Sequence, residues 1–150
     1  MIRMSLGDFA ALVERTAMRA PRAERLALRI AGARLAAASR GYIGEYQMGI
    51  GGFPDWAPLA PSTREEKIRK GYSPPDNPLL RTGQLRASIR FTVQGRSAII
   101  GTDDPVGGYQ EFGTARIPPR PFVGLAVAQY GQREARQVFA SVLSPLLKGR

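Results

Sequence analysis

A run of alternating apolar and polar residues most constrains what this chain can fold into. From Leu85 to Gln94, the odd-numbered positions are apolar and the even-numbered positions are polar. A period of two over a run of this length is typical of a strand with one buried face and one solvated face. Gln94-Gly95-Arg96-Ser97 then supplies a turn, and Ala98 to Ile100 form a short apolar return strand. The sequence therefore predicts an antiparallel hairpin.

Helical periodicity lies on both sides of this hairpin. In residues 5–46, apolar side chains recur on one arc at 3.6 residues per turn, and arginines gather on the opposite side. Pro21 lies inside this segment, so we expect either two helices or one kinked helix. Either a solvated face or a contact with nucleic acid would explain why the arginines gather on one side. A second helix is expected over residues 122–144, where Pro145 ends it.

The segment between the first helix and the hairpin is rich in glycine and proline. Residues 47–80 therefore predict extended loops, interrupted by a short exposed helix near residues 62–70 that Ser62 or Thr63 caps. Trp56 is the chain's single tryptophan. We interpret it as an anchor that pins the loop to the core, in preference to a platform on which a base stacks, because a large aromatic side chain gains most from burial.

These elements predict an α+β fold in one domain spanning residues 1–150. The long N-terminal helical segment (5–46) and the C-terminal helix (122–144) would pack on the small antiparallel sheet. Residues 47–80 supply loops and the short helix, and residues 81–121 supply the hairpin and a corner motif.

The charge of the chain favours an anionic partner. Twenty-two lysines and arginines face twelve acidic residues, giving a net charge of +10, and 19 of the basic residues are arginines. The excess lies in residues 1–40 and 81–150. Such a charge favours contact with polyanions or with an acidic protein surface, although a solvated face explains it equally well.

The chemistry available to the chain argues against catalysis. The sequence contains no cysteine and no histidine, so it lacks the commonest general base and the commonest metal ligands. Asp103 and Asp104 are better interpreted as a turn cap than as a cation site. Glu111 is the acid inside the densest motif, and a buried ion pair with an arginine such as Arg120 would explain it. We expect no enzymatic activity, no cofactor and no metal site.

An ordered series of short motifs resembles a known family. The series consists of Trp56-Ala57-Pro58-Leu59 with Ser62-Thr63, Leu80-Arg81-Thr82-Gly83-Gln84-Leu85 with Ser88-Ile89, Ile100-Gly101-Thr102, Tyr109-Gln110-Glu111-Phe112-Gly113-Thr114, and Pro119-Arg120-Pro121-Phe122. In this order and spacing, the chain resembles the neck and tail-completion proteins of tailed bacteriophages, the phage virion morphogenesis or minor tail protein type. The resemblance covers most of the chain. One departure is the loop from Gly71 to Asn77, which is longer than in a minimal member.

The resemblance implies a structural role for the motifs. Arg81, Thr82 and Gly83 would shape the entry to the first strand. The corner beneath the last helix would be fixed by Tyr109, Glu111, Phe112 and Gly113. Arg120 and Phe122 would dock that helix or a neighbouring subunit.

The resemblance also implies a location and partners. Such proteins form a ring, expected here to be a hexamer, at the head–tail interface or upper tail of the virion, and DNA passes through the lumen. The expected partners are other neck or tail-tube proteins and packaged DNA, contacted without sequence preference; synthesis is expected in the host cytoplasm, with no membrane contact.

Arg86 and Arg90 are the candidate residues for the lumen. Both lie on the polar face of the predicted strand. Salt bridges at a subunit interface would account for them equally well. The alternative function is a small basic nucleic-acid-binding module without catalytic activity. The position of Phe91 on the apolar side, away from both arginines, counts against this alternative, because such modules place aromatic and basic side chains together.

Overall fold

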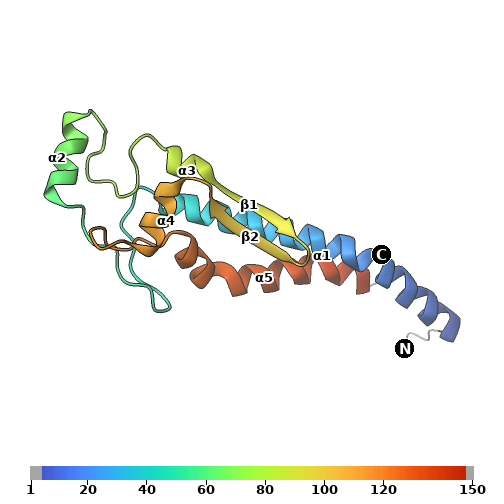
Figure 1. Ribbon diagram of the computed structural model, residues 1–150. Helices are drawn as coiled ribbons and strands as arrows, with labels where there is room; N and C mark the ends of the chain where they lie inside the picture. The colour runs from blue at the N-terminus through green and yellow to red at the C-terminus, as the bar shows by residue number, and fades with distance from the viewer. Residues whose placement is uncertain (1–4, 148–150) are drawn as a thin grey trace.

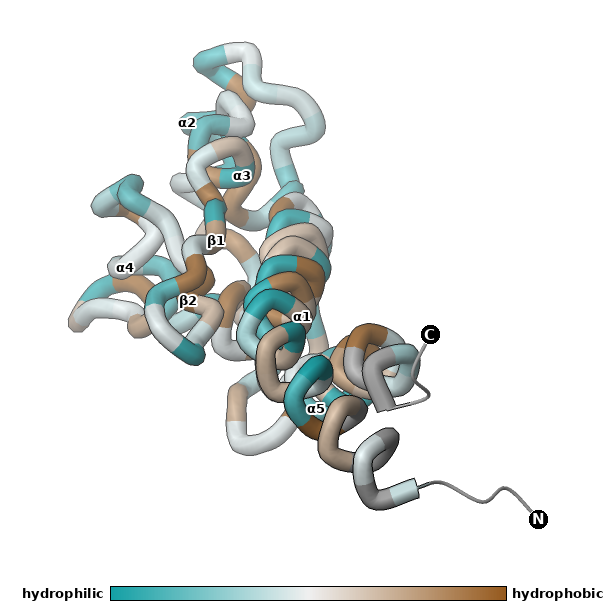
Figure 2. Tube along the Cα trace, turned by 90° about the vertical axis from the view of Figure 1, so that its right-hand side faces the viewer, coloured by the Kyte–Doolittle hydropathy of each residue, from teal (hydrophilic) through white to brown (hydrophobic). Residues whose placement is uncertain are grey.

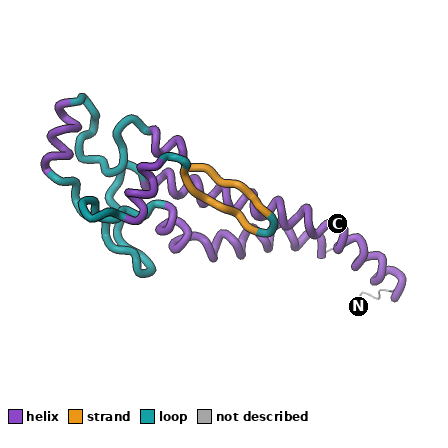
Figure 3. Tube along the Cα trace, in the orientation of Figure 1, coloured by secondary structure: helices purple, strands orange, loops and turns teal. Residues whose placement is uncertain are grey.

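The computed structural model describes residues 5–147 of the chain. Two long helices, α1 and α5, lie side by side, and a two-stranded hairpin packs on α1 (Figure 1). Figure 2 views the molecule from the end at which α1 begins and α5 ends. At the opposite end the loops gather around the short helices (Figure 3). In chain order the elements are α1 (Leu6–Tyr42), α2 (Pro61–Arg69), α3 (Gln84–Ser88), β1 (Ile89–Gln94), β2 (Ser97–Thr102), α4 (Pro105–Phe112) and α5 (Val123–Leu147). The predicted α+β fold class is confirmed.

Helix α1 is continuous through Pro21. The proline removes one backbone hydrogen bond, that to the carbonyl of Ala17, and Ala17 is exposed, so water can satisfy this carbonyl. The apolar arc keeps one phase across the proline, and beyond it Ala27 and Ala31 are buried against Val138 of α5. Burial of this face begins only beyond the proline, since Ala10, Val13 and Ala17 on the same arc are exposed.

Helix α5 also continues through a proline, since Pro145 lies inside it. The prediction that Pro145 ends the helix is therefore wrong. A proline this close to a helix end removes only one bond of the last turns, which costs less than it would in the interior.

The predicted strand from Leu85 is half wrong. Its first part forms the helical turn α3, and β1 begins only at Ile89. Leu85 and Ile89 are four residues apart, so both a strand and a helical turn place them on one side. Two residues distinguish the alternatives: Ala87 is exposed, and Ser88 is buried with its hydroxyl donating to the carbonyl of Leu85 at 2.8 Å.

The hairpin itself follows the prediction. Strands β1 and β2 pair antiparallel, with Phe91 opposite Ile100 and Thr92 opposite Ile99, and the chain turns at Gly95, whose φ is 55°. Phe91 packs on α1, where a Cβ added to Gly32 would lie 2.7 Å from the ring. A glycine at this point of the helix therefore lets the hairpin approach closely.

The core lies where α1, α5 and the loops meet. Trp56 is 4% exposed and belongs to this core, which is where an anchor for its loop would lie. The remaining buried members are Ala36, Tyr42, Ile43, Leu85, Ile89, Phe122, Leu125 and Ala126. None of the helices described over residues 5–147 has an apolar stretch long enough to cross a bilayer.

Candidate assembly surface and motif corner

Helix α4 is fixed at both ends by local backbone chemistry. At its start, the carboxylate of Asp104 accepts a hydrogen bond from the backbone N–H of Val106 at 2.9 Å, and Pro105 occupies the first turn. The interpretation of this aspartate as a cap is confirmed. At its end, Gly113 adopts φ 73° and ψ 176°, a conformation essentially restricted to glycine.

Glu111 holds the first turn of α5. Its carboxylate accepts three backbone hydrogen bonds, from the N–H groups of Phe122 (2.8 Å), Val123 (3.0 Å) and Gly124 (2.7 Å). These are orphan donors at the positive end of the helix dipole, so a carboxylate there is doubly favourable. The predicted ion pair between Glu111 and Arg120 is therefore wrong, because the carboxylate is occupied by the helix N-terminus.

Arg120 binds a loop in place of an acid. Its guanidinium donates to the carbonyl of Ala57 from Nε (3.2 Å) and Nη2 (2.8 Å), and to the carbonyl of Pro58 from Nη2 at 3.2 Å. Its own backbone N–H donates to the carbonyl of Gln110 at 2.6 Å. Arg120 is only 5% exposed, and burial lowers its pKa below the usual range of an arginine. The residue thus ties the Trp56 loop to α4, while the neighbouring Phe122 lies in the core.

The two aromatic residues of the corner motif do not fix the corner. Tyr109 is 56% exposed and Phe112 is 84% exposed, in contrast to the expected packing beneath the last helix. With the exposed Val106, they recur every three residues along α4 and share one face. We call these three residues the α4 stripe. The α4 stripe is an exposed apolar surface, and the helix that carries it is fixed at both of its ends.

The Arg81-Thr82-Gly83 motif leads into α3, not directly into a strand. Arg81 donates from Nη2 to Glu66 of α2 at 3.2 Å, and the Thr82 hydroxyl accepts from the backbone N–H of Gln84 at 3.3 Å. Gly83 adopts the left-handed conformation, with φ 83° and ψ 0°, just before α3. The motif therefore links α2 to α3 and starts the helical turn.

The two candidate lumen arginines lie on different elements. Arg86 is in α3, and its Nε donates to the carbonyl of Arg40 in the last turn of α1 at 3.0 Å. Arg90 is on the outer face of β1 and pairs with Asp103 at 3.3 Å. Both are exposed, but they do not share the single strand face that the sequence predicted. Arg40 also departs from the expected basic outer face, because it donates to the backbone carbonyl of Ile89.

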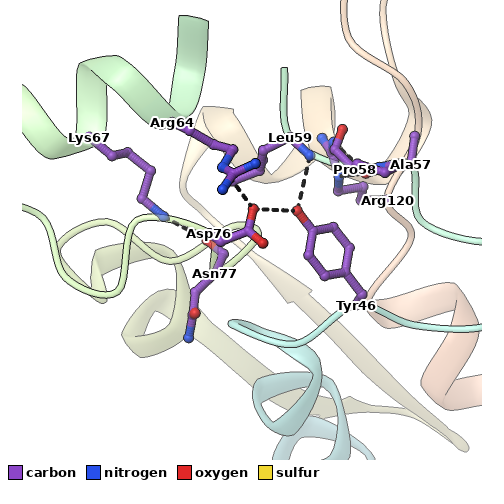
Figure 4. Close-up of polar contacts among 9 residues, drawn as sticks. All are labelled: Tyr46, Ala57, Pro58, Leu59, Arg64, Lys67, Asp76, Asn77 and Arg120. Carbon is purple, nitrogen blue, oxygen red and sulfur yellow. Dashed lines mark hydrogen bonds and ion pairs between the residues drawn. The ribbon is translucent and has the colours of Figure 1, made fainter. Parts of the chain in front are cut away.

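Sequence reasoning missed Lys67. The short helix α2 starts at Pro61 with no side-chain cap from Ser62 or Thr63, and Lys67 is 2% exposed within it. Its Nζ donates to the backbone carbonyl of Asn77 at 2.7 Å (Figure 4). Burial, and next the charge of Arg81, lower the pKa of Lys67. The sequence of α2 does not signal this burial. From the sequence, Ile68 would be expected inside and Lys67 outside, and the structure has the reverse.

A pocket of about 550 Å³ opens between these elements. It is bordered by α2, by the Arg81-Thr82-Gly83 motif, by α4 and by residues 116–118 and 120. Over residues 5–147, no group of three or more acidic, cysteine or histidine side chains could hold a metal ion. The pocket therefore brings two sequence motifs, those around Arg81 and Arg120, to one place.

Comparison with known proteins gives one relative. No protein-family model matches the chain, and no solved structure matches it. The chain is 35% identical over 81 residues to the Mu-like prophage FluMu G protein 2 of Haemophilus influenzae, an alignment that covers 49% of this chain and 50% of that protein. The chain thus spans about half the length of the curated relative it matches. This similarity supports a phage-derived protein.

Proposed function

We propose that this chain is a structural virion protein of the head–tail connection, a tail-completion, terminator or neck-ring subunit. Its copies would form a ring, a hexamer, through whose lumen DNA passes. The similarity to a Mu-like prophage protein supports the phage context. The proposal assigns the chain no catalytic step; its partners are further copies of itself and other neck or tail-tube proteins.

The α4 stripe is the observation that carries the ring. A ring subunit needs two different surfaces that meet head to tail around a closed circle. Phe112 is 84% exposed on a helix whose ends Asp104 and Gly113 hold in place. An exposed aromatic side chain on a well-capped helix is the kind of residue that becomes the centre of a protein interface.

The exposed arginines support a DNA-lined lumen. Arg15, Arg19, Arg22 and Arg29 are exposed along α1, and Arg86 and Arg90 are exposed on α3 and β1. Contacts between arginines and phosphates do not depend on the base sequence, which suits DNA that slides through a ring.

Native mass spectrometry of wild type and of Phe112→Asp tests this proposal. We expect wild type to form closed hexamers and Phe112→Asp to remain monomeric, since a charge placed at the centre of an apolar contact is desolvated without a partner. Because Phe112 touches little of its own chain, the variant should keep its melting temperature. Met48→Asp, at an apolar residue 80% exposed outside α4, is the matched control and should still assemble. A wild-type chain that stays monomeric at high concentration and with tail-tube protein, or a Phe112→Asp variant that assembles normally, contradicts the proposal.

A further inference from the structure

Two buried cations that form no ion pair border the same pocket. Lys67 is 2% exposed and Arg120 is 5% exposed. Each donates to backbone carbonyls, Lys67 to Asn77 and Arg120 to the loop of Ala57 and Pro58 (Figure 4). Within residues 5–147 neither forms an ion pair. The nearby carboxylate of Asp76 pairs with Arg64 at 3.3 Å, and its charge raises the pKa of Lys67 by less than burial lowers it.

This arrangement is unfavourable for the isolated chain. Lysine and arginine are almost never fully buried unless an opposite charge accompanies them. Burial lowers the pKa of both groups, so the surrounding protein stabilises their charged forms less well than water does. A carbonyl offers only a partial charge, and Asn77 takes one of the three protons that a lysine ammonium can donate.

The rest of the lining is suited to a polypeptide. Arg81 and Arg116 add two further cationic residues, whereas Asp104, the acid of the lining, already caps α4. The buried side-chain oxygen of Gln110 has no hydrogen-bond partner and could accept a backbone N–H. Apolar side chains complete the walls: Leu59, Leu79, Leu80, Val106 and Ile117.

We propose that this pocket binds an extended acidic segment of a partner polypeptide, with an aspartate or glutamate carboxylate received by Lys67 and Arg120. An apolar neighbour of that acidic residue would lie against the leucine-lined wall, and a backbone N–H would donate to Gln110. The site belongs to a single subunit and does not depend on ring formation, so it goes beyond the assembly role proposed above.

Burial of the two cations favours a peptide over nucleic acid. The phosphates of a duplex lie on the outside of a stiff, wide rod, which meets exposed arginines and cannot enter a pocket of about 550 Å³. A single extended chain can enter it, and its apolar side chains match the apolar walls in a way that a sugar–phosphate backbone does not.

The test is selection of binders from a random dodecapeptide library displayed on yeast, using the full-length protein as bait. We expect the enriched sequences to share an aspartate or glutamate next to an apolar residue. The best sequence, made as a free labelled peptide, should lose affinity by roughly thirty-fold or more when its acidic residue is changed to the amide, since a buried charge then loses its partner.

Lys67→Met is the decisive variant of the protein. It should lower the affinity for the selected peptide by a similar factor and leave the melting temperature unchanged or raised, because an unpaired buried charge is replaced by an apolar side chain of similar length. Lys70→Met, three residues away and exposed in its pair with Glu66, should bind the peptide as wild type does.

Three results would overturn the assignment. These are enriched peptides without an acidic residue, a free peptide whose amide version binds equally well, and displacement of the peptide from the pocket by a short DNA duplex. The replacement of the acidic residue by its amide is made in the peptide and needs no protein variant. It therefore tests the proposed carboxylate contact even if Lys67→Met fails to fold.

Discussion

Gly113→Val should lower the free energy of unfolding by about 3 kcal/mol. The backbone at Gly113, with φ 73° and ψ 176°, is in a region that β-branched residues do not adopt. A Cβ at this position would also lie 2.9 Å from the carbonyl oxygen of Ile117 and 2.9 Å from the nitrogen of Pro119. Both of these are backbone atoms in a proline-stiffened segment, so neither can move aside cheaply. Urea unfolding followed by circular dichroism measures the change.

Gly108→Val is the matched control for this prediction. Gly108 lies in the same helix, and a Cβ added there meets nothing within 4 Å. Its stability should stay within about 0.5 kcal/mol of wild type, since valine and glycine are both modest helix formers. Equal stability of the two variants would show that the end of α4 is not the rigid corner described above.

Glu111→Ala should cost about 3 kcal/mol, and Glu111→Gln about half as much. The alanine leaves three backbone N–H groups at the start of α5 without their acceptor. Glutamine keeps one oxygen, which can still accept from Phe122 and Val123, but it loses the charge and the acceptor for the N–H of Gly124. Hydrogen exchange should also become faster at the amides of Phe122, Val123 and Gly124.

Glu65→Ala provides the reference for this series. Glu65 is exposed on α2, so its loss should change stability by no more than about 0.5 kcal/mol. If Glu111→Ala unfolds at the same urea concentration as Glu65→Ala, the three hydrogen bonds do not anchor α5.

The sequence predicted the fold class, the hairpin and the two long helices because each depends on a repeated pattern. The limits of these elements were less predictable. A strand and a helical turn would both bury Leu85 and Ile89. The alternating pattern therefore could not distinguish α3 from the start of a longer strand. At Pro21 and Pro145 the helix continues because the lost hydrogen bond costs little: the carbonyl of Ala17 is left at an exposed position, and Pro145 lies in the last turns of α5.

The corner was mispredicted because opposite charges in two neighbouring motifs suggested an ion pair. Glu111 and Arg120 instead satisfy backbone groups of other segments. Helix α5 begins at Val123, directly after Pro121 and Phe122, and none of these residues has a capping side chain. That absence was a signal in the sequence that another residue must supply the cap. The burial of Lys67 had no such signal, since it depends on how the loop containing Asn77 returns to α2.

The most direct test of the proposed function is electron microscopy of particles made without this chain. In the phage or prophage that encodes it, the gene is deleted and supplied again from a plasmid as wild type or as Phe112→Asp. We predict that the deletion and the Phe112→Asp complement yield heads and tails that are not joined, and that the wild-type complement restores whole virions. Complete, infectious virions in the absence of the chain would contradict a role in the head–tail connection.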